Sequence, residues 1–151
     1  MKLGKKEIAK MSLNSSIDEL EATMLDNFPI ANCTTNHVFT DGMYVRETTM
    51  PTGSLITSKI HKTQHIFFVM KGKAIVWIDG KEQLVEAPYI GITEPNTRRV
   101  LYILDCCTWA TSHPNPDNET LEQIEDRIIE KHDNPFLSIE MKNRLSNLLN
   151  K

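Results

Sequence analysis

The sequence lacks the features that mark membrane, secreted and strongly cationic proteins. No apolar run approaches the roughly 18 residues of a membrane-spanning helix, and the first residues contain no signal-peptide core. The 17 basic and 20 acidic residues give a net charge of −3 without a dense basic stripe, which argues against a nucleic-acid partner. We therefore expect a cytoplasmic protein that binds neither nucleic acid nor membrane.

Cysteine is scarce, and the motifs of several enzyme classes are missing. The three cysteines, Cys33, Cys106 and Cys107, are odd in number and poorly spaced for a disulfide framework, so we expect reduced thiols. The sequence has no glycine-rich phosphate loop, no Gly-x-Ser-x-Gly turn and no Cys-x-x-Cys pair. Nothing therefore points to a nucleotide-binding loop, a serine-hydrolase nucleophile or a cysteine-based zinc site.

What is present is a strand-rich centre between two helical segments. Residues 37–113 are rich in Val, Ile, Thr, Tyr and Phe, with turn signals every eight to twelve residues, a spacing typical of an antiparallel sandwich or barrel. We predict one structural domain, made of an N-terminal helical extension over 1–36, a barrel over 37–113, and C-terminal helices over 114–151 that pack on the barrel.

Turn residues and hydrophobic periodicity place the elements. Ser16 and Glu19 match a capping box, Asp117 or Asn118 can cap a second helix, and Pro135 suits the first position of a third. Asp79-Gly80 is the strongest hairpin signal. The predicted strands cover 43–50, 54–61, 65–71, 73–79, 82–87, 89–93, 99–104 and 108–113, and the predicted helices cover 16–26, 118–131 and 135–149.

The candidate chemistry lies in the middle of the strand-rich segment. Lys59 and His61 are two residues apart on one predicted strand, so their side chains face the same way, and His65 opens the next strand. If that face is the barrel interior, a lysine and imidazoles converge on one cavity. Imidazole is a common ligand of transition metals.

This run resembles the first signature of the cupin superfamily, G-x5-H-x-H-x3-E-x6-G. Lys59 stands in place of the first histidine and His65 in place of the glutamate. The resemblance covers about residues 44–113 and implies a mainly β fold with flanking helices: an antiparallel cupin-like β-barrel, also called a double-stranded β-helix or jelly roll. The matching positions are Gly53, Lys59, His61, His65 and Gly72.

The second cupin signature, G-x5-P-x-G-x2-H-x3-N, keeps its proline turn at Pro95 but has no histidine at or beside Val100. A third metal ligand must come from elsewhere, and we predict that His113 supplies it. If strands 99–104 and 108–113 form a hairpin, Arg99 lies opposite His113, and cross-strand partners share a face. A two-residue turn would shift this register and turn His113 outward.

Two hypotheses for the site follow. In the first, His61, His65 and His113 hold a divalent transition metal (zinc, iron, nickel or manganese), as in a metal-dependent enzyme. In the second, no metal is bound, and the cations Lys59, Arg99 and Arg46 hold a small anionic ligand such as a sugar acid or a nucleotide derivative. Lys59 favours the second hypothesis because a lysine repels a divalent cation, whereas the histidines favour the first.

The order of segments is also similar to that of small single-domain cupin-like proteins of bacteriophages and prophages. The shared features are the Tyr-Val-Arg-Glu strand, the Lys-x-His-x3-His motif, the Pro-x-Thr-x-Arg turn and a tryptophan strand ending in His-Pro-Asn. This resemblance implies the host-cell cytoplasm as the location and no settled activity. It leaves a third hypothesis open, a non-catalytic phage interaction protein.

The sequence predicts three helices with apolar stripes, but one or two helices would be enough to cover the outer face of one closed barrel. We therefore expect a homodimer, joined through the stripe of Leu137, Met141, Leu145 and Leu148. His37 and His132 are expected to be surface residues that take no part in the site.

Overall fold

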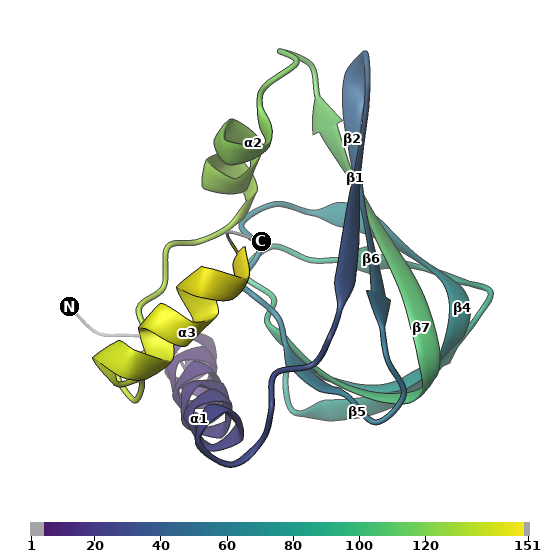
Figure 1. Ribbon diagram of the computed structural model, residues 1–151. Helices are drawn as coiled ribbons and strands as arrows, with labels where there is room; N and C mark the ends of the chain where they lie inside the picture. The colour runs from purple at the N-terminus through teal and green to yellow at the C-terminus, as the bar shows by residue number, and fades with distance from the viewer. Residues whose placement is uncertain (1–4, 150–151) are drawn as a thin grey trace. The chain divides into compact units, whose positions relative to one another are not determined.

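The computed structural model describes residues 5–149, and the chain divides into two compact units. The larger unit, residues 31–131, contains all the strands and one helix (Figure 1). The smaller unit combines the N-terminal segment up to Ile30 with the C-terminal segment from His132. The packing of this C-terminal segment on the barrel stays a prediction.

The larger unit is an antiparallel sheet of seven strands. The central strand order is β1-β2-β7-β4-β5; β3 pairs with β7, β6 pairs with β4, and every strand pairing is antiparallel. The sheet bends around its interior without closing strictly. The strands are β1 (Thr34–Thr40), β2 (Gly42–Met50), β3 (Leu55–Thr57), β4 (His65–Ile78), β5 (Lys81–Glu86), β6 (Tyr89–Thr93) and β7 (Arg99–Asn115), followed by the helix α2 (Leu121–Ile128).

Alternation along the strands separates an apolar interior from the outer face. Side chains at every second position of a strand point to the same face, so Phe67 and Val69 of β4 lie inside while Ile66 lies outside. The interior cluster consists of Met50, Phe67, Val69, Ala74, Val76, Val85, Leu101, Ile103, Cys107 and Trp109. The hairpin predicted at Asp79-Gly80 is confirmed, with positive φ values of 49° and 76° at these two residues.

Two of the predicted turns are wrong, because the chain continues through them as strand. At Gly72 the pairing of β4 with β7 shifts register, and β4 continues as one strand from His65 to Ile78. A Cβ at Gly72, whose φ is +82°, would collide with the backbone oxygens of Asp105 and Cys106. Glycine is needed here for close approach of two strands at a bulge rather than for a turn.

The predicted hairpin between 99–104 and 108–113 is the second wrong turn. β7 runs unbroken from Arg99 to Asn115, with β3 and β2 along one edge and β4 along the other. Asp105 pairs in register with Lys73, and their side chains approach to 3.5 Å. Arg99 and His113 are therefore not cross-strand partners, because they lie on the same strand.

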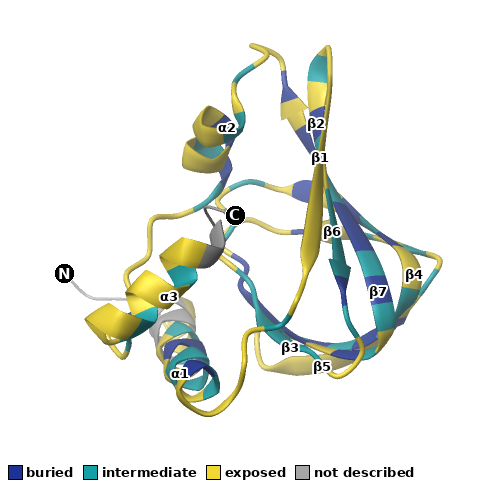
Figure 2. Cartoon of the chain, in the orientation of Figure 1, coloured by how far each residue is buried: buried dark blue, intermediate teal, exposed yellow. Residues whose placement is uncertain are grey.

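One strand was not predicted. β1 spans the predicted boundary between the N-terminal extension and the barrel, at residues 36 and 37. It is exposed along its whole length (Figure 2). It pairs only with β2 among the described elements, with His37 opposite Arg46. An edge strand without a buried face shows little of the apolar alternation that identifies a strand in a sequence.

The helices begin and end at other residues than predicted. The first helix, α1 (Lys5–Asn27), contains Ser16 in its interior, so the capping box at Ser16 is wrong. The cap of α2 is Thr120, which accepts from Gln123 N while the Gln123 side chain accepts from Thr120 N. Asn118 instead adopts a positive φ of 47° and binds Gly42 N through its side chain.

The last helix, α3 (Ile139–Leu149), begins after the predicted start at residue 135. In the smaller unit, the buried Asp18 carboxylate lies 2.8 Å from His132 Nε2, and Asn134 Nδ2 donates to the Asp18 carbonyl oxygen. Arg144 donates to Leu25 O. These bonds tie the N-terminal and C-terminal segments together. None of the helices described has both the length and the apolarity needed to cross a bilayer.

Candidate functional site

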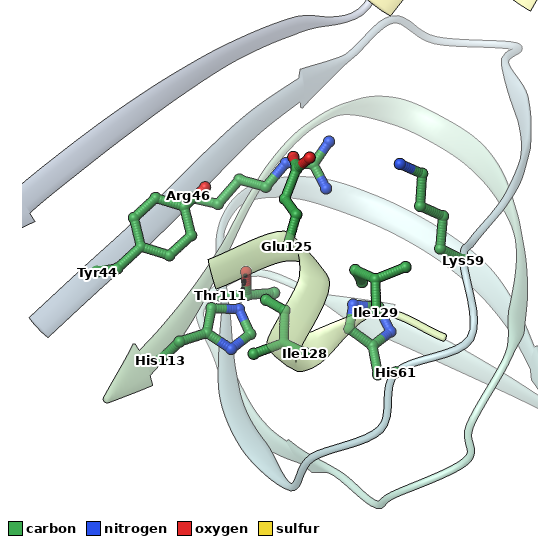
Figure 3. A pocket seen from close by; sticks show the side chains of 9 residues that line it. All are labelled: Tyr44, Arg46, Lys59, His61, Thr111, His113, Glu125, Ile128 and Ile129. Atoms are coloured by element: carbon green, nitrogen blue, oxygen red, sulfur yellow. Dashed lines mark hydrogen bonds between the residues drawn. The ribbon is translucent and has the colours of Figure 1, made fainter. Parts of the chain in front are cut away.

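A small cavity lies in the larger unit among β2, β7, α2 and the segment that precedes β4 (Figure 3). The cavity has a volume of about 20 Å³, and a single buried water needs roughly 10–15 Å³. The cavity therefore has room for about one water molecule. It is lined by Tyr44, Arg46, Lys59, His61, Thr111, His113, Glu125, Ile128 and Ile129.

His61 is placed by backbone pairing on both sides. It forms isolated β-bridges with Thr97 and with Ile129, which directly follows α2. Lys62 N donates to Ile128 O at 2.7 Å. Lys59 and His61 both line the cavity, as their spacing predicts, although β3 ends before them at Thr57.

The three histidines predicted as a cluster lie next to one another. Ile66 of β4 pairs with Ser112 of β7, which brings the neighbouring residues His65 and His113 together. Their ring centroids are 4.5 Å apart, and those of His61 and His65 are 4.8 Å apart. His113 lies beside His65, as the prediction requires, but the pairing of β4 with β7 places it there and not the predicted hairpin. Its role as a metal ligand stays a prediction.

All three imidazoles are uncharged at neutral pH. Burial, followed by the neighbouring His65 and Arg99, lowers the pKa of His61 to about 3. Burial, followed by His65 and Arg127, lowers the pKa of His113 to about 3. The pKa of His65 is also lowered, again mainly by burial.

Two of these buried imidazoles have a nitrogen without a partner. His65 Nδ1 lies 3.2 Å from the carbonyl oxygen of Thr63, which only accepts, so Nδ1 carries the proton and Nε2 has a bare lone pair. His113 Nε2 lies 3.0 Å from Thr111 Oγ1. Within the described part of the chain, His65 Nε2 and His113 Nδ1 are buried and make no hydrogen bond. Unpaired polar atoms in a protein interior are unusual and call for an explanation.

The charged groups in the lining are mostly positive. Arg46 and Lys59 both line the cavity, and Glu125 of α2 is the one carboxylate among the described lining residues. In Figure 3 the charged ends of Arg46, Glu125 and Lys59 lie on one side of the view and the imidazoles of His61 and His113 on the other. Two of the three cations predicted to bind an anion are therefore at the cavity.

Arg99, the third predicted cation, lies outside the lining. Its side chain is buried, with the guanidinium carbon 4.6 Å from the centroid of the Phe67 ring and 5.8 Å from that of Trp109, and it donates to Thr93 Oγ1. Burial lowers the pKa of Arg99 to about 10, which leaves it charged at neutral pH. It acts on the site through its charge, which lowers the pKa of His61 and of His65.

Tyr44 is a site residue that the sequence did not reveal. Its side chain is 1% exposed, lines the cavity and stacks on the His113 ring at 5.8 Å between centroids. The hydroxyl lies 2.7 Å from His37 Nδ1. His37 is an exposed residue, as predicted, and it lies outside the lining but contacts Tyr44, which belongs to the lining. Because β1 was not predicted, nothing in the sequence placed His37 beside Tyr44.

The three histidines meet only part of the requirements of a metal site. A hydrogen bond from one ring nitrogen to a carbonyl oxygen, as in His65, is typical of metal-binding histidines. Yet no three His, Cys, Asp or Glu side chains of the described residues are arranged to hold an ion, and Arg46 and Lys59 repel cations. The arrangement does not fit a preformed metal site.

No protein-family model matches this sequence, and no curated protein matches it by sequence. Its structure is similar to the EutQ protein of Clostridium difficile, with 14% identity, 62% of this chain and 75% of that chain covered, and a TM-score of 0.50. It is also similar to a cupin superfamily protein of Desulfitobacterium hafniense, with 7% identity, 62% and 85% coverage and a TM-score of 0.48. For KdgF of Halomonas sp. the identity is 12%, the coverage 57% and 83%, and the TM-score 0.47.

The fold is cupin-like. The predicted fold class, an antiparallel jelly roll with one N-terminal and two C-terminal helices, is confirmed. At these identities the likeness concerns fold alone, and cupin-like barrels carry many functions. The resemblance to bacteriophage proteins stays a prediction.

Proposed function

We propose that this protein binds a small anionic ligand, without a metal, at the cavity beside β2, β7 and α2. The observation that supports this most directly is the charge of the lining, where Arg46 and Lys59 outnumber the single carboxylate of Glu125. The adjacent imidazoles are uncharged and add no negative potential. An anion entering this site gains from both cations, whereas a divalent cation is repelled by them.

The imidazoles narrow the chemistry of the ligand. The two imidazoles of the lining, His61 and His113, are uncharged, so each offers one donor and one acceptor nitrogen and adds no positive charge to attract a carboxylate or phosphate. A ligand that satisfies both parts of the site therefore carries an anionic group for Arg46 and Lys59 and a hydroxyl or amine donor for the imidazoles. Hydroxylated acids, including sugar acids, and nucleotide derivatives have this composition.

Titration with gluconate, a hydroxylated carboxylate, tests the proposal by calorimetry or NMR. Arg46→Gln and Lys59→Gln should each raise the Kd by about tenfold or more, because hydrogen bonds to charged groups contribute roughly 1.5–3 kcal/mol. Lys81→Gln is the matched control, since Lys81 is an exposed lysine at the hairpin of β4 and β5. Acetate, which has no hydroxyl, should bind more weakly. Equal affinity in all three variants would contradict the proposal.

A second candidate is a transition-metal site at His61, His65 and His113, of zinc, iron, nickel or manganese. The unpaired nitrogens of His65 and His113 favour it, since a metal ion would satisfy both after rotation of the side chains. A bound ion would supply a Lewis acid beside the anionic ligand.

Metal analysis of untagged protein separates the two candidates. Stoichiometric metal that is lost in His61→Ala, His65→Ala and His113→Ala but kept in His132→Ala would establish the metal site. His132 is a suitable control because it pairs with Asp18 in the smaller unit. His37 is a poor control because it contacts Tyr44 of the lining.

A further inference from the structure

We infer that α2 is a lid over the ligand cavity and that the incoming anionic ligand displaces the Glu125 carboxylate from the neighbourhood of Arg46 and Lys59. This inference rests on the proposed function, since it concerns how the same anionic ligand gains access. It assigns a role to residues that neither the cupin-like motif nor the histidine cluster includes.

The first observation is the size of the cavity. Pockets for drug-sized ligands measure about 300–1,000 Å³, whereas this one measures about 20 Å³. Glu125 and Ile128 of α2, with Ile129 directly after the helix, form a third of its lining. A hydroxylated acid cannot enter unless part of the wall moves. The other walls belong to β2 and β7, which pair with each other along nine residues, and to the segment before β4.

The second observation is that α2 is attached by far fewer contacts than the strands. Its apolar contacts form a cluster of three buried residues, Tyr44, Ile124 and Ile128, against ten in the barrel core. Elements with few buried apolar contacts are the ones that open locally. The helix is eight residues long, well below the length at which an isolated helix is stable.

The polar attachments of α2 lie mainly at its two ends. Before its first turn, the Asn115 side chain accepts from Glu119 N at 2.8 Å and donates to Glu119 O at 3.2 Å. At its last turn, Lys62 N donates to Ile128 O and Lys62 Nζ donates to Asp126 O at 2.9 Å. The same end is also held by Arg127 Nη2, which donates to Pro114 O, and by Glu130 N, which donates to Ile60 O. Opening at this end breaks these few bonds, while Asn115 still holds the other end.

The third observation concerns charge. Glu125 presents the one carboxylate of the described lining to a space shared with Arg46 and Lys59. Burial raises the pKa of Tyr44, and the two charges beside it act in opposite directions, Arg46 lowering it and Glu125 raising it. With the cavity closed, Glu125 partly neutralises the cations. A ligand carboxylate or phosphate at the same place is repelled by Glu125, so binding and the closed position of Glu125 compete.

The decisive comparison is between two glutamates of one helix. Glu125→Gln removes the competing charge and should lower the Kd for gluconate about fivefold or more. Glu122→Gln should leave it unchanged, because both glutamates are exposed but only Glu125 lines the cavity. Glu125→Gln binding no tighter than wild type overturns the role of Glu125, while loss of binding in Arg46→Gln would still support the proposed function. Absence of gluconate binding in every variant, Glu125→Gln included, overturns both.

The lid itself is tested by association kinetics. Ile124 is fully buried and does not line the cavity, so Ile124→Ala loosens the packing of α2 without touching the ligand. If opening of α2 limits entry, this variant should bind gluconate several times faster than wild type in stopped-flow or NMR exchange measurements. Ile90→Ala, at an exposed site on β6, should bind at the wild-type rate. An unchanged association rate in a folded Ile124→Ala protein overturns the lid.

Discussion

β4 and β7 are paired along both halves of their length, but their inward side chains are apolar in one half and include buried histidines in the other. In one half, Ala74 and Val76 of β4 pair with Ile103 and Leu101 of β7, and all four side chains belong to the apolar core. In the other half, inward positions carry His65 and His113, which have unpaired buried nitrogens. Burial of apolar area stabilises a fold by roughly 25 cal/mol per Å², whereas an unpaired buried polar group costs about 1–3 kcal/mol.

This difference separates the half of the barrel that stabilises the fold from the half that carries the polar side chains of the candidate site. Burial of the apolar half stabilises the fold, whereas the unpaired nitrogens of the half that holds the site make the fold less stable. Substitutions in the apolar half should therefore lower stability, whereas replacement of a buried histidine should reduce the loss of stability in acid.

The largest effect is expected from a cavity in the apolar half. Ile103 is fully buried, and Ile103→Ala should lower the free energy of unfolding by about 2–5 kcal/mol because it removes packed methyl groups. Urea unfolding followed by circular dichroism measures this. Ile90→Ala, at a 68% exposed position, should change it by less than about 0.5 kcal/mol. Similar losses in both variants would contradict the assignment of the core.

The site half should make the fold sensitive to acid. The pKa of His61 and of His113 is about 3 in the folded protein, against about 6.5 when unfolded. Between these values the unfolded chain binds more protons, so stability is full above pH 6.5 and falls as the pH is lowered towards 3. The expected loss between pH 6.5 and 5 is on the order of 2 kcal/mol per histidine.

Comparison of wild type with His113→Phe at pH 7 and pH 5 isolates this contribution from that of the carboxylates. Phenylalanine cannot take up a proton, so the variant should lose less stability than wild type between the two pH values. An equal loss in both proteins would mean that His113 is not held uncharged by the fold.

A smaller effect is expected at the bond between β1 and the site. Tyr44→Phe removes the hydroxyl that lies 2.7 Å from His37 Nδ1 and should lower the free energy of unfolding by about 0.5–1.5 kcal/mol. His37→Phe should lower it by a similar amount, and the double variant by little more than either, because both remove one bond. Fully additive losses in the double variant would show that the two side chains act independently.

The smallest effect on the barrel is expected from the predicted dimer interface. Of its four residues, Leu137 lies before α3, Met141 and Leu145 are half-buried, and the side chain of Leu148 lies outside the described residues. The homodimer stays a prediction. Light scattering after size-exclusion chromatography should give twice 17.3 kDa, falling to the single mass in Leu145→Glu with no change in barrel stability. A single mass for wild type at all concentrations would rule the dimer out.

The fold class was predictable because alternation and turn residues are local properties. Apolar positions two residues apart identified most of the strands, and Asp79-Gly80 identified a hairpin that is present. The same local signals failed at Gly72 and Asp105. Both residues are typical of turns, but β4 and β7 pair with each other at these positions. Gly72 lies at a bulge of β4, and Asp105 is a paired residue of β7.

The sequence by itself determined an antiparallel barrel and the pair His61 and His65, because the period of a strand and the spacing of a motif are properties of neighbouring residues. Only the tertiary structure decided that His113 joins them, that Arg99 stays outside the lining, and that Tyr44 and Glu125 belong to the cavity. These placements depend on which strands pair, in which register, and on where α2 packs. Such contacts join residues far apart in the chain, and no local pattern encodes them.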